Sequence, residues 1–197
     1  MKSLDLQKLL ETIKPAKLVA VTKGHELSAC MPLYEAGIKT FGENRVQDAL
    51  PKMESAPKDI SWHFIGTLQK NKVNKVVGKF DLIHSVDSFD LAEKISKTGP
   101  QKILLQVNVR HRHGFSPEDL RECFSDLLKL PNLSIEGLMT MAPDTDDKTL
   151  IRSTFRDLRL LRDELGLKEL SMGMSQDWQI ALDEGATLLR IGSKLFE

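Results

Sequence analysis

The clearest hydrophobic pattern in the chain is a run of apolar or near-apolar residues at 18–22, followed directly by Lys23 and Gly24. A short run without polar alternation is typical of a strand that is buried on both faces of a parallel sheet. Because alternate side chains of a strand share one face, Lys23 falls on the face of Val19 and Val21, at the carboxyl end of the strand. The run therefore predicts a core strand that ends in a lone cation.

Strand-like and helix-like patterns alternate along the rest of the chain. The predicted strands cover residues 18–24, 39–42, 61–66, 81–85, 102–109, 133–141, 170–172 and 187–192. The predicted helices cover residues 1–14, 26–36, 44–54, 68–77, 87–97, 117–127, 151–165 and 176–184. Such alternation gives either a closed barrel or an open doubly wound sheet.

The number of units decides between these two folds. Eight strand and helix units favour the barrel, and no G-x-G-x-x-G motif follows the first strand, which removes the usual dinucleotide site of the open sheet. The sequence thus predicts an α/β fold, a single (β/α)8 TIM barrel that occupies residues 1–197 as one domain.

Composition narrows the classes of function. The 197 residues are 41% hydrophobic and 28% charged, as expected for a globular protein with a real core, and the formal net charge is zero. No global charge therefore favours a nucleic acid or an anionic membrane as partner. The nearest approach to a basic patch is Lys70, Lys72, Lys75 and Lys79, and without aromatic residues among them they predict a solvated helix face.

The cysteines, the histidines and the lengths of the apolar runs argue against a disulfide-rich protein, a metal protein and a membrane protein. Cys30 and Cys123 lie far apart and form no C-x-x-C pair, which gives no support for a disulfide framework or a zinc site. His111 and His113 offer only a poor metal site in a loop. The first 14 residues fit an amphipathic helix, and no run approaches the length of a membrane span. We therefore expect a cytoplasmic protein that contacts no membrane and binds no metal.

Lys23 is the first candidate for chemistry. A lysine at the end of a buried strand loses hydration, and a half-buried ammonium tends to lose its proton. The neutral amine can then form a Schiff base with an aldehyde. The alternative is a structural lysine whose stem covers apolar surface while its charged head reaches solvent.

Anion-binding residues are expected after the last two strands, where barrels commonly hold phosphate. Ser175 follows the seventh strand, and we expect it to cap the next helix, whose free backbone N–H groups favour an anion. Gly192 and Ser193 end the eighth strand and offer close backbone approach, an N–H group and a hydroxyl. Each serine alone is more simply read as a helix cap or turn, but together with Lys23 they indicate a site.

Arg190 shares strand parity with Leu188 and Gly192, and we expect it to point towards the barrel mouth with the glycine. A buried guanidinium needs an acceptor. The sequence leaves two choices open, the carboxylate of Glu43 as a structural partner or the ring nitrogen of a pyridine cofactor.

Six ordered motifs give the chain a resemblance to a known family. They are VAVTK at 19–23, FGEN at 41–44, WHFIG at 62–66 together with LQxNK at 68–72, GLMTM at 137–141, LSMGMS at 170–175 and RIG at 190–192. Through these motifs the chain resembles the pyridoxal phosphate homeostasis proteins over nearly its whole length. The resemblance implies a barrel of the alanine racemase N-terminal type that binds pyridoxal 5'-phosphate (PLP).

The resemblance also implies roles for individual residues. Lys23 would hold PLP as a Schiff base, and Arg190 would face the pyridine nitrogen. The other residues implied in cofactor binding surround the phosphate or line the pocket: Ser175, Gly192 and Ser193 at the phosphate, Asn44 and His63 along the pocket. One loop departs from the family pattern, since residues 110–113 replace a longer segment that often contains a lysine, and no contact is carried over to it.

Three functions are weighed. The resemblance implies a non-catalytic carrier that buffers or delivers PLP in vitamin B6 homeostasis. We expect a monomer, with apo PLP enzymes as its recipients. The alternative is a PLP-dependent amino-acid racemase, which in this fold needs a tyrosine opposite the lysine and a second domain to supply it. The single tyrosine, Tyr34, falls in the helix after the first strand, and little chain follows the last strand, so we expect the carrier. A barrel with an unrelated small-molecule site is the third reading.

Overall fold

The computed structural model describes residues 3–110 and 113–196, and its centre is a closed barrel of eight parallel strands. The strands follow one another around the barrel in chain order, and β8 closes it against β1. They are Lys17–Val21 (β1), Thr40–Glu43 (β2), Ser61–Phe64 (β3), Leu82–Val86 (β4), Gln101–Gln106 (β5), Leu133–Met139 (β6), Glu169–Ser171 (β7) and Leu188–Ile191 (β8). All eight predicted strands are confirmed, most of them shorter than predicted.

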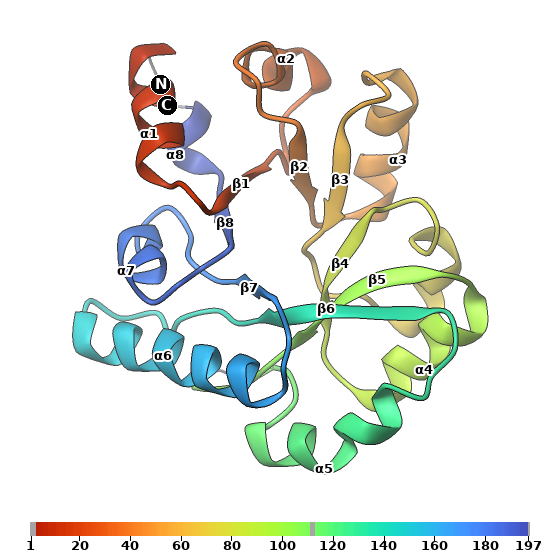
Figure 1. Cartoon of the computed structure of the whole chain (residues 1–197). Helices are drawn as coiled ribbons and strands as arrows, with labels where there is room; N and C mark the ends of the chain where they lie inside the picture. Colours follow the sequence, from red (N-terminus) through yellow and green to blue (C-terminus); the bar gives the residue numbers. More distant parts are fainter. Residues whose placement is uncertain (1–2, 111–112, 197) are drawn as a thin grey trace.

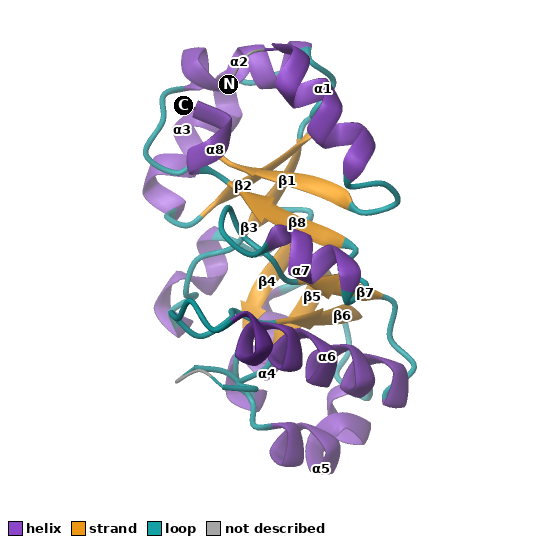
Figure 2. Cartoon of the chain, turned by 90° about the vertical axis from the view of Figure 1, so that its left-hand side faces the viewer, coloured by secondary structure: helices purple, strands orange, loops and turns teal. Residues whose placement is uncertain are grey.

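Helices connect the strands and cover the outside of the barrel (Figures 1 and 2). They are Ser3–Thr12 (α1), Leu27–Glu35 (α2), Val46–Ser55 (α3), Phe89–Thr98 (α4), Pro117–Leu127 (α5), Lys148–Glu164 (α6), Trp178–Asp183 (α7) and Ser193–Phe196 (α8), with a 3-10 helix, Lys70–Lys75 (η1), after β3. The predicted (β/α)8 barrel is therefore confirmed.

One predicted helix is wrong in type. The segment 68–77 was expected to be an α-helix, but it contains only η1. Three β-branched valines and two asparagines fall in this segment, and both residue types are weak helix formers.

The strands separate two apolar clusters, one inside the barrel and one outside it. Val19 of β1 and Leu188 of β8 cluster with Leu82, Leu104 and Met139, which come from the opposite side of the ring, so these five side chains meet inside the barrel. The larger cluster fills the layer between the strands and the helices. Side-chain alternation with a period of two residues therefore determines which groups reach the barrel interior.

The structure bears on three expectations from the sequence, which concern a membrane span, a disulfide and a histidine metal site. Within the described ranges, no helix has both the length and the apolar character needed to cross a membrane. Cys30 and Cys123 are free thiols. His111 lies outside the described residues, so the structure does not test its pairing with His113.

Candidate functional site

The carboxyl ends of four neighbouring strands, β7, β8, β1 and β2, bring most of the predicted site residues to one mouth of the barrel. Val21 pairs with Gly42 of β2, so Lys23 and Asn44 each follow that pair by two residues. On the other side of β1, the turn after β8 begins at Gly192. Lys23 therefore lies between the loop with Asn44 and the turn after β8.

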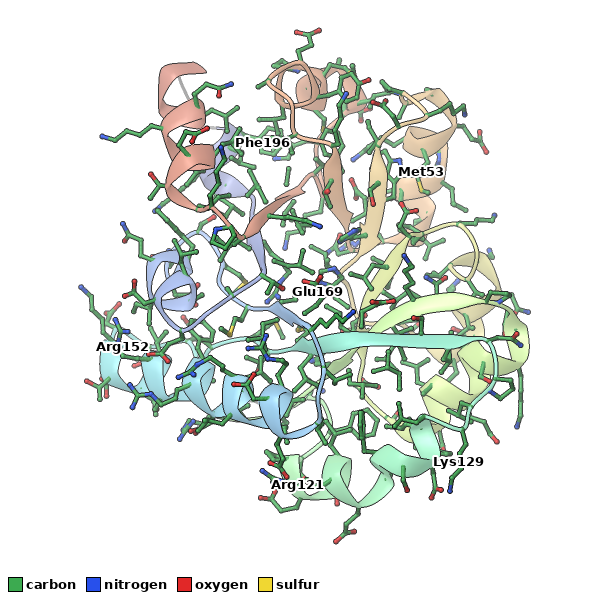
Figure 3. All side chains as sticks on the ribbon, in the orientation of Figure 1. Met53, Arg121, Lys129, Arg152, Glu169 and Phe196 are labelled. Carbon is green, nitrogen blue, oxygen red and sulfur yellow. The ribbon has the colours of Figure 1, made fainter. Side chains whose placement is uncertain are left out.

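Lys23 itself is exposed in the structure. The expectation of a half-buried ammonium is therefore wrong, because β1 ends at Val21 and the chain turns at Gly24, which has a φ of +75°. The loop after β1 is held against α8 by a stacked contact between His25 and Phe196, whose ring centroids lie 3.7 Å apart; Phe196 is labelled in Figure 3. Exposure leaves the amine accessible to a ligand that arrives from solvent.

The two serines predicted to bind phosphate meet at this mouth. Ser193 Oγ donates a hydrogen bond to Ser175 Oγ at 3.1 Å, although 18 residues separate them in the chain. A Cβ atom at Gly192 would lie 3.2 Å from the Cβ of Val21 and 3.3 Å from its carbonyl oxygen, so the glycine lets the turn after β8 pack closely against β1. The prediction that these loops come together after β7 and β8 is confirmed.

The predicted cap role of Ser175 is wrong. Ser175 lies in the turn before α7, and Asp177 occupies the N-cap position. The N–H of Met174 donates to the Asp177 carboxylate at 2.6 Å, which fixes the turn. Burial raises the pKa of Asp177, against the opposing effects of this hydrogen bond and of Arg190. The Ser175 hydroxyl therefore takes no part in capping α7 and pairs with Ser193 instead.

Arg190 lies inside the barrel, on the strand face of Gly192 and two residues deeper. Its Nη1 donates to Ser171 Oγ at 2.5 Å, and its Nη2 donates to the carbonyl oxygen of Thr140 at 2.9 Å. Burial lowers the pKa of Arg190 to about 10, partly offset by Asp177, so the guanidinium remains charged at neutral pH. The orientation predicted from strand parity is confirmed.

Of the two partners left open for Arg190, the carboxylate of Glu43 is excluded by the structure. Glu43 alternates with Gly42 and faces the helix layer outside the barrel, where it is fully buried. Its Oε1 forms an ion pair with Lys52 Nζ of α3 at 2.5 Å and accepts a hydrogen bond from Thr22 Oγ1 at 2.6 Å. Glu43, Lys52 and Thr22 therefore form a buried polar cluster between the barrel strands and the helix layer, next to the end of β1.

A chain of polar side chains crosses the barrel interior from Arg190 to His63. Ser171 Oγ lies 2.8 Å from His84 Nδ1, and His84 Nε2 lies 2.9 Å from His63 Nδ1. Because Arg190 only donates, the single hydroxyl hydrogen of Ser171 is available to His84 Nδ1, which leaves the ring hydrogen on His84 Nε2 for donation to His63. The chain thus fixes the guanidinium of Arg190 in place.

His63 lies at the far end of this chain from Arg190. It borders a cavity of about 350 Å³ whose other walls include Lys17, Asp81 and Glu169, at or near the amino ends of their strands. Glu169 appears near the middle of the ring of strands in Figure 3. Burial lowers the pKa of His63 to about 4, Asp81 raises it and Lys17 lowers it further. The structure thus places His63 beside the amino-end cavity, and its predicted contact with a cofactor at the mouth stays a prediction.

Asn44 is half-buried and follows β2 directly. Its backbone rests against Gly66, where a Cβ atom would lie only 2.2 Å from the carbonyl oxygen of Asn44. This contact explains why a glycine ends the WHFIG motif, and it fixes the loop that holds Asn44 beside Lys23.

Sequence analysis missed three residues that hold buried polar groups in place. His84 and Ser171 link Arg190 to His63, and Lys52 holds Glu43. His84 had a usable signal, since it is a polar residue within the apolar strand Leu82–Val86. Lys52 had none, because a lysine near the end of a surface helix is ordinary.

Comparisons with known proteins place this geometry in a family. The family model described as "Alanine racemase, N-terminal domain" matches residues 5–197. A relative from Aquifex aeolicus, named pyridoxal phosphate homeostasis protein, is 44% identical over 92% of this chain and 86% of its own. A Synechocystis relative of the same name is 40% identical over 95% of this chain and 94% of its own.

Solved structures agree with the sequence relatives. PipY of Synechococcus elongatus, in a structure with PLP bound, is 39% identical, with a TM-score of 0.93 over 99% of both chains. An alanine racemase from Corynebacterium glutamicum is 18% identical, with a TM-score of 0.75 over 96% of this chain and 58% of the racemase, a likeness of fold alone.

Proposed function

The chain belongs to the family of pyridoxal phosphate homeostasis proteins, and on this premise we propose that it is a non-catalytic carrier that holds PLP as a Schiff base on Lys23 and buffers or delivers it. The observation that supports this most strongly is the meeting of Ser175 and Ser193 at 3.1 Å, beside Gly192 and next to the strand that leads to Lys23. PipY, a near full-length neighbour, has a structure with PLP bound.

The residues at the mouth fit the two ends of PLP. The hydroxyls of Ser175 and Ser193 supply donors for a phosphate, and Gly192, which has no side chain, lets the turn that carries Ser193 lie close to the end of β1. Arg190 is a fixed, buried cation two residues deeper on the same face, where it would meet the pyridine nitrogen. Asn44, on the other side of Lys23, would border the ring.

Covalent attachment uses the one reactive group of Lys23. Its Nζ would hold the aldehyde carbon of PLP through a carbon–nitrogen double bond, and the aldehyde oxygen would leave as water with the two amine hydrogens. Bound PLP supplies an electron sink for carbanion chemistry, and its strength depends on protonation of the ring nitrogen. Arg190, which remains charged at neutral pH, disfavours that protonation and so favours storage over catalysis.

The position of the only tyrosine favours the carrier over the racemase. Tyr34 lies in α2, and its hydroxyl donates to Asp59 at 2.7 Å while Lys39 Nζ lies 3.4 Å from its ring centroid. These contacts engage Tyr34 on the helix layer, away from the strand mouth. We therefore propose no proton transfer to or from an amino acid by this residue.

Two assays separate these functions. The PLP-loaded protein is mixed with an apo-enzyme that needs PLP, and the recovered activity of that enzyme reports transfer. In parallel, the loaded protein is incubated with alanine in heavy water, and deuterium at the α-carbon is measured. The proposal predicts transfer without exchange, whereas exchange at about 1 per second or faster would support the racemase.

The setting of this function is part of the same proposal. We propose apo PLP enzymes as the recipients, because exposed Lys23 is accessible to another protein at the mouth. We also propose a monomer, and the cytoplasm as its compartment, in keeping with the two free cysteines of the described chain.

A further inference from the structure

Behind the strand that leads to Lys23 lies a buried ion pair with no part in the cofactor site described so far. Glu43, at the end of β2, is fully buried, and the side chain of Lys52 in α3 is 8% exposed. Their charged atoms lie 2.5 Å apart. Glu43 Oε2 is buried without a hydrogen-bond partner among the described residues, so only Oε1 is used.

Both members of this pair bind the same residue, Thr22, which directly precedes Lys23. Glu43 Oε1 accepts from Thr22 Oγ1 at 2.6 Å, and Lys52 Nζ donates to the carbonyl oxygen of Thr22 at 3.0 Å. The N–H of Thr22 donates to the carbonyl oxygen of Gly42 at 3.0 Å. The amide, carbonyl and side chain of Thr22 therefore each have a partner in β2 or α3, and the carbonyl also accepts from the N–H of His25.

The carbonyl of Thr22 is half of the peptide group that joins Thr22 to Lys23. Two hydrogen bonds, from Lys52 Nζ and from the N–H of His25 at 3.2 Å, hold this planar group, and its orientation in turn determines the direction in which the Lys23 side chain leaves the backbone. This matters because the strand has ended at Val21, so no ladder of strand hydrogen bonds restrains the chain at Lys23.

Stability alone is a weak reason for such a pair. Moving two charges out of water costs about as much as their attraction returns, and apolar replacements of buried ion pairs are often neutral or stabilising. One carboxylate oxygen here even lacks a partner. The pair does provide two fixed hydrogen-bonding groups for Thr22, the Lys52 ammonium as donor and the Glu43 carboxylate as acceptor.

We propose that Glu43 and Lys52 are positioning residues that orient Lys23 for Schiff-base formation through Thr22. This inference rests on the proposed function. It assigns to the pair the covalent part of PLP binding and leaves the phosphate and ring contacts to the loops after β7 and β8.

The test separates covalent from noncovalent binding. Dissociation constants are measured for PLP and for pyridoxine 5'-phosphate, in which an alcohol replaces the aldehyde, so that it cannot form a Schiff base. The ratio of the two constants reports the covalent gain. In Glu43→Gln and Lys52→Met we expect this gain to fall tenfold or more, about 1.4 kcal/mol, because misplacing a reacting group by about 1 Å is costly. Pyridoxine 5'-phosphate should bind within about twofold of the parent.

Further variants keep the test decisive if one charge change prevents folding. Thr22→Val preserves shape but removes the hydroxyl, and should lose covalent gain, whereas Thr22→Ser retains the hydroxyl and should recover it. Lys129→Met breaks an exposed ion pair with Asp126, on the far side from Phe196 in Figure 3, and serves as the control that keeps the full gain.

Each outcome has one interpretation. If the affinities for both ligands fall by the same factor in the Thr22 and ion-pair variants, the role of the pair is merely structural and the inference is overturned. It is also overturned if neither affinity changes. A parent protein that binds PLP no more tightly than pyridoxine 5'-phosphate would refute the proposed Schiff base itself, which is a distinguishable failure.

Discussion

Acid should weaken the folded protein through His63. The folded barrel lowers the pKa of His63 to about 4, with burial as the main cause, against about 6.5 in an unfolded chain. Between these two values the unfolded chain holds a proton that the folded protein does not. The free energy of unfolding therefore falls as the pH falls from about 6.5 to about 4, and the contribution of His63 is fully present above that window.

The magnitude follows from the shift. At 1.36 kcal/mol per pKa unit, His63 alone removes about 3 kcal/mol of stability across the window, a large part of the 5–15 kcal/mol typical of a domain. His84, which faces His63, acts in the same direction, because burial lowers its pKa well below the ordinary value. Asp81 and Lys17 are the other charged groups that act on His63, with opposite effects on its pKa.

Urea unfolding at pH 7, 6, 5 and 4.5 tests this reasoning. His63→Gln removes the titrating ring and keeps a polar side chain beside His84. Between pH 7 and 4.5 we expect the variant to lose about 2–3 kcal/mol less than the parent. Leu128→Gln changes an exposed side chain that carries no titrating group, and serves as the control with the slope of the parent. Equal slopes for the parent and His63→Gln would refute the argument.

Four other substitutions test separate parts of the structure. Ser175→Ala and Ser193→Ala should each weaken PLP binding by about 1.5–3 kcal/mol, roughly tenfold to a hundredfold in a titration, and parent-like affinity would contradict the phosphate assignment. Gly173→Ala should lower the free energy of unfolding by about 2–4 kcal/mol, because φ is +89° and the new Cβ would lie 2.5 Å from the Cβ of Ala181. Gly166→Ala, with positive φ but open space, is its control and should cost about 1 kcal/mol. Ser171→Ala should cost about 1–3 kcal/mol in urea, since Arg190 and His84 lose a buried partner; a loss no larger than that of exposed Ser134→Ala would contradict this.

The sequence was sufficient for the fold and for the residues at the mouth because both follow from local pattern. Apolar runs and helical periodicity predicted the alternation of strands and helices, and strand parity placed Arg190 on the face of Gly192. The rule that barrels bind anions after the last two strands brought Ser175 and Ser193 together. None of these inferences needed the identity of a distant contact.

What the sequence could not provide were the partners of buried charges. Glu43 was a reasonable acceptor for Arg190. It directly follows Gly42 in β2, however, so its side chain points to the opposite face of the strand, outside the barrel, where it contacts Lys52. The cap role of Ser175 was wrong because Asp177, two residues later, takes the N-cap position. Lys23 is exposed because its strand ends two residues earlier, a boundary that apolar pattern does not locate.

The central claim is that PLP is held covalently at Lys23, and borohydride reduction tests it most directly. The protein is incubated with PLP, reduced, digested and analysed by mass spectrometry for the fixed pyridoxyl group. We expect the label on the peptide that contains Lys23, and no fixed label in Lys23→Ala, which should still bind pyridoxine 5'-phosphate through the serine loops. A stoichiometric label on another lysine, or a label that persists in Lys23→Ala, would contradict the account.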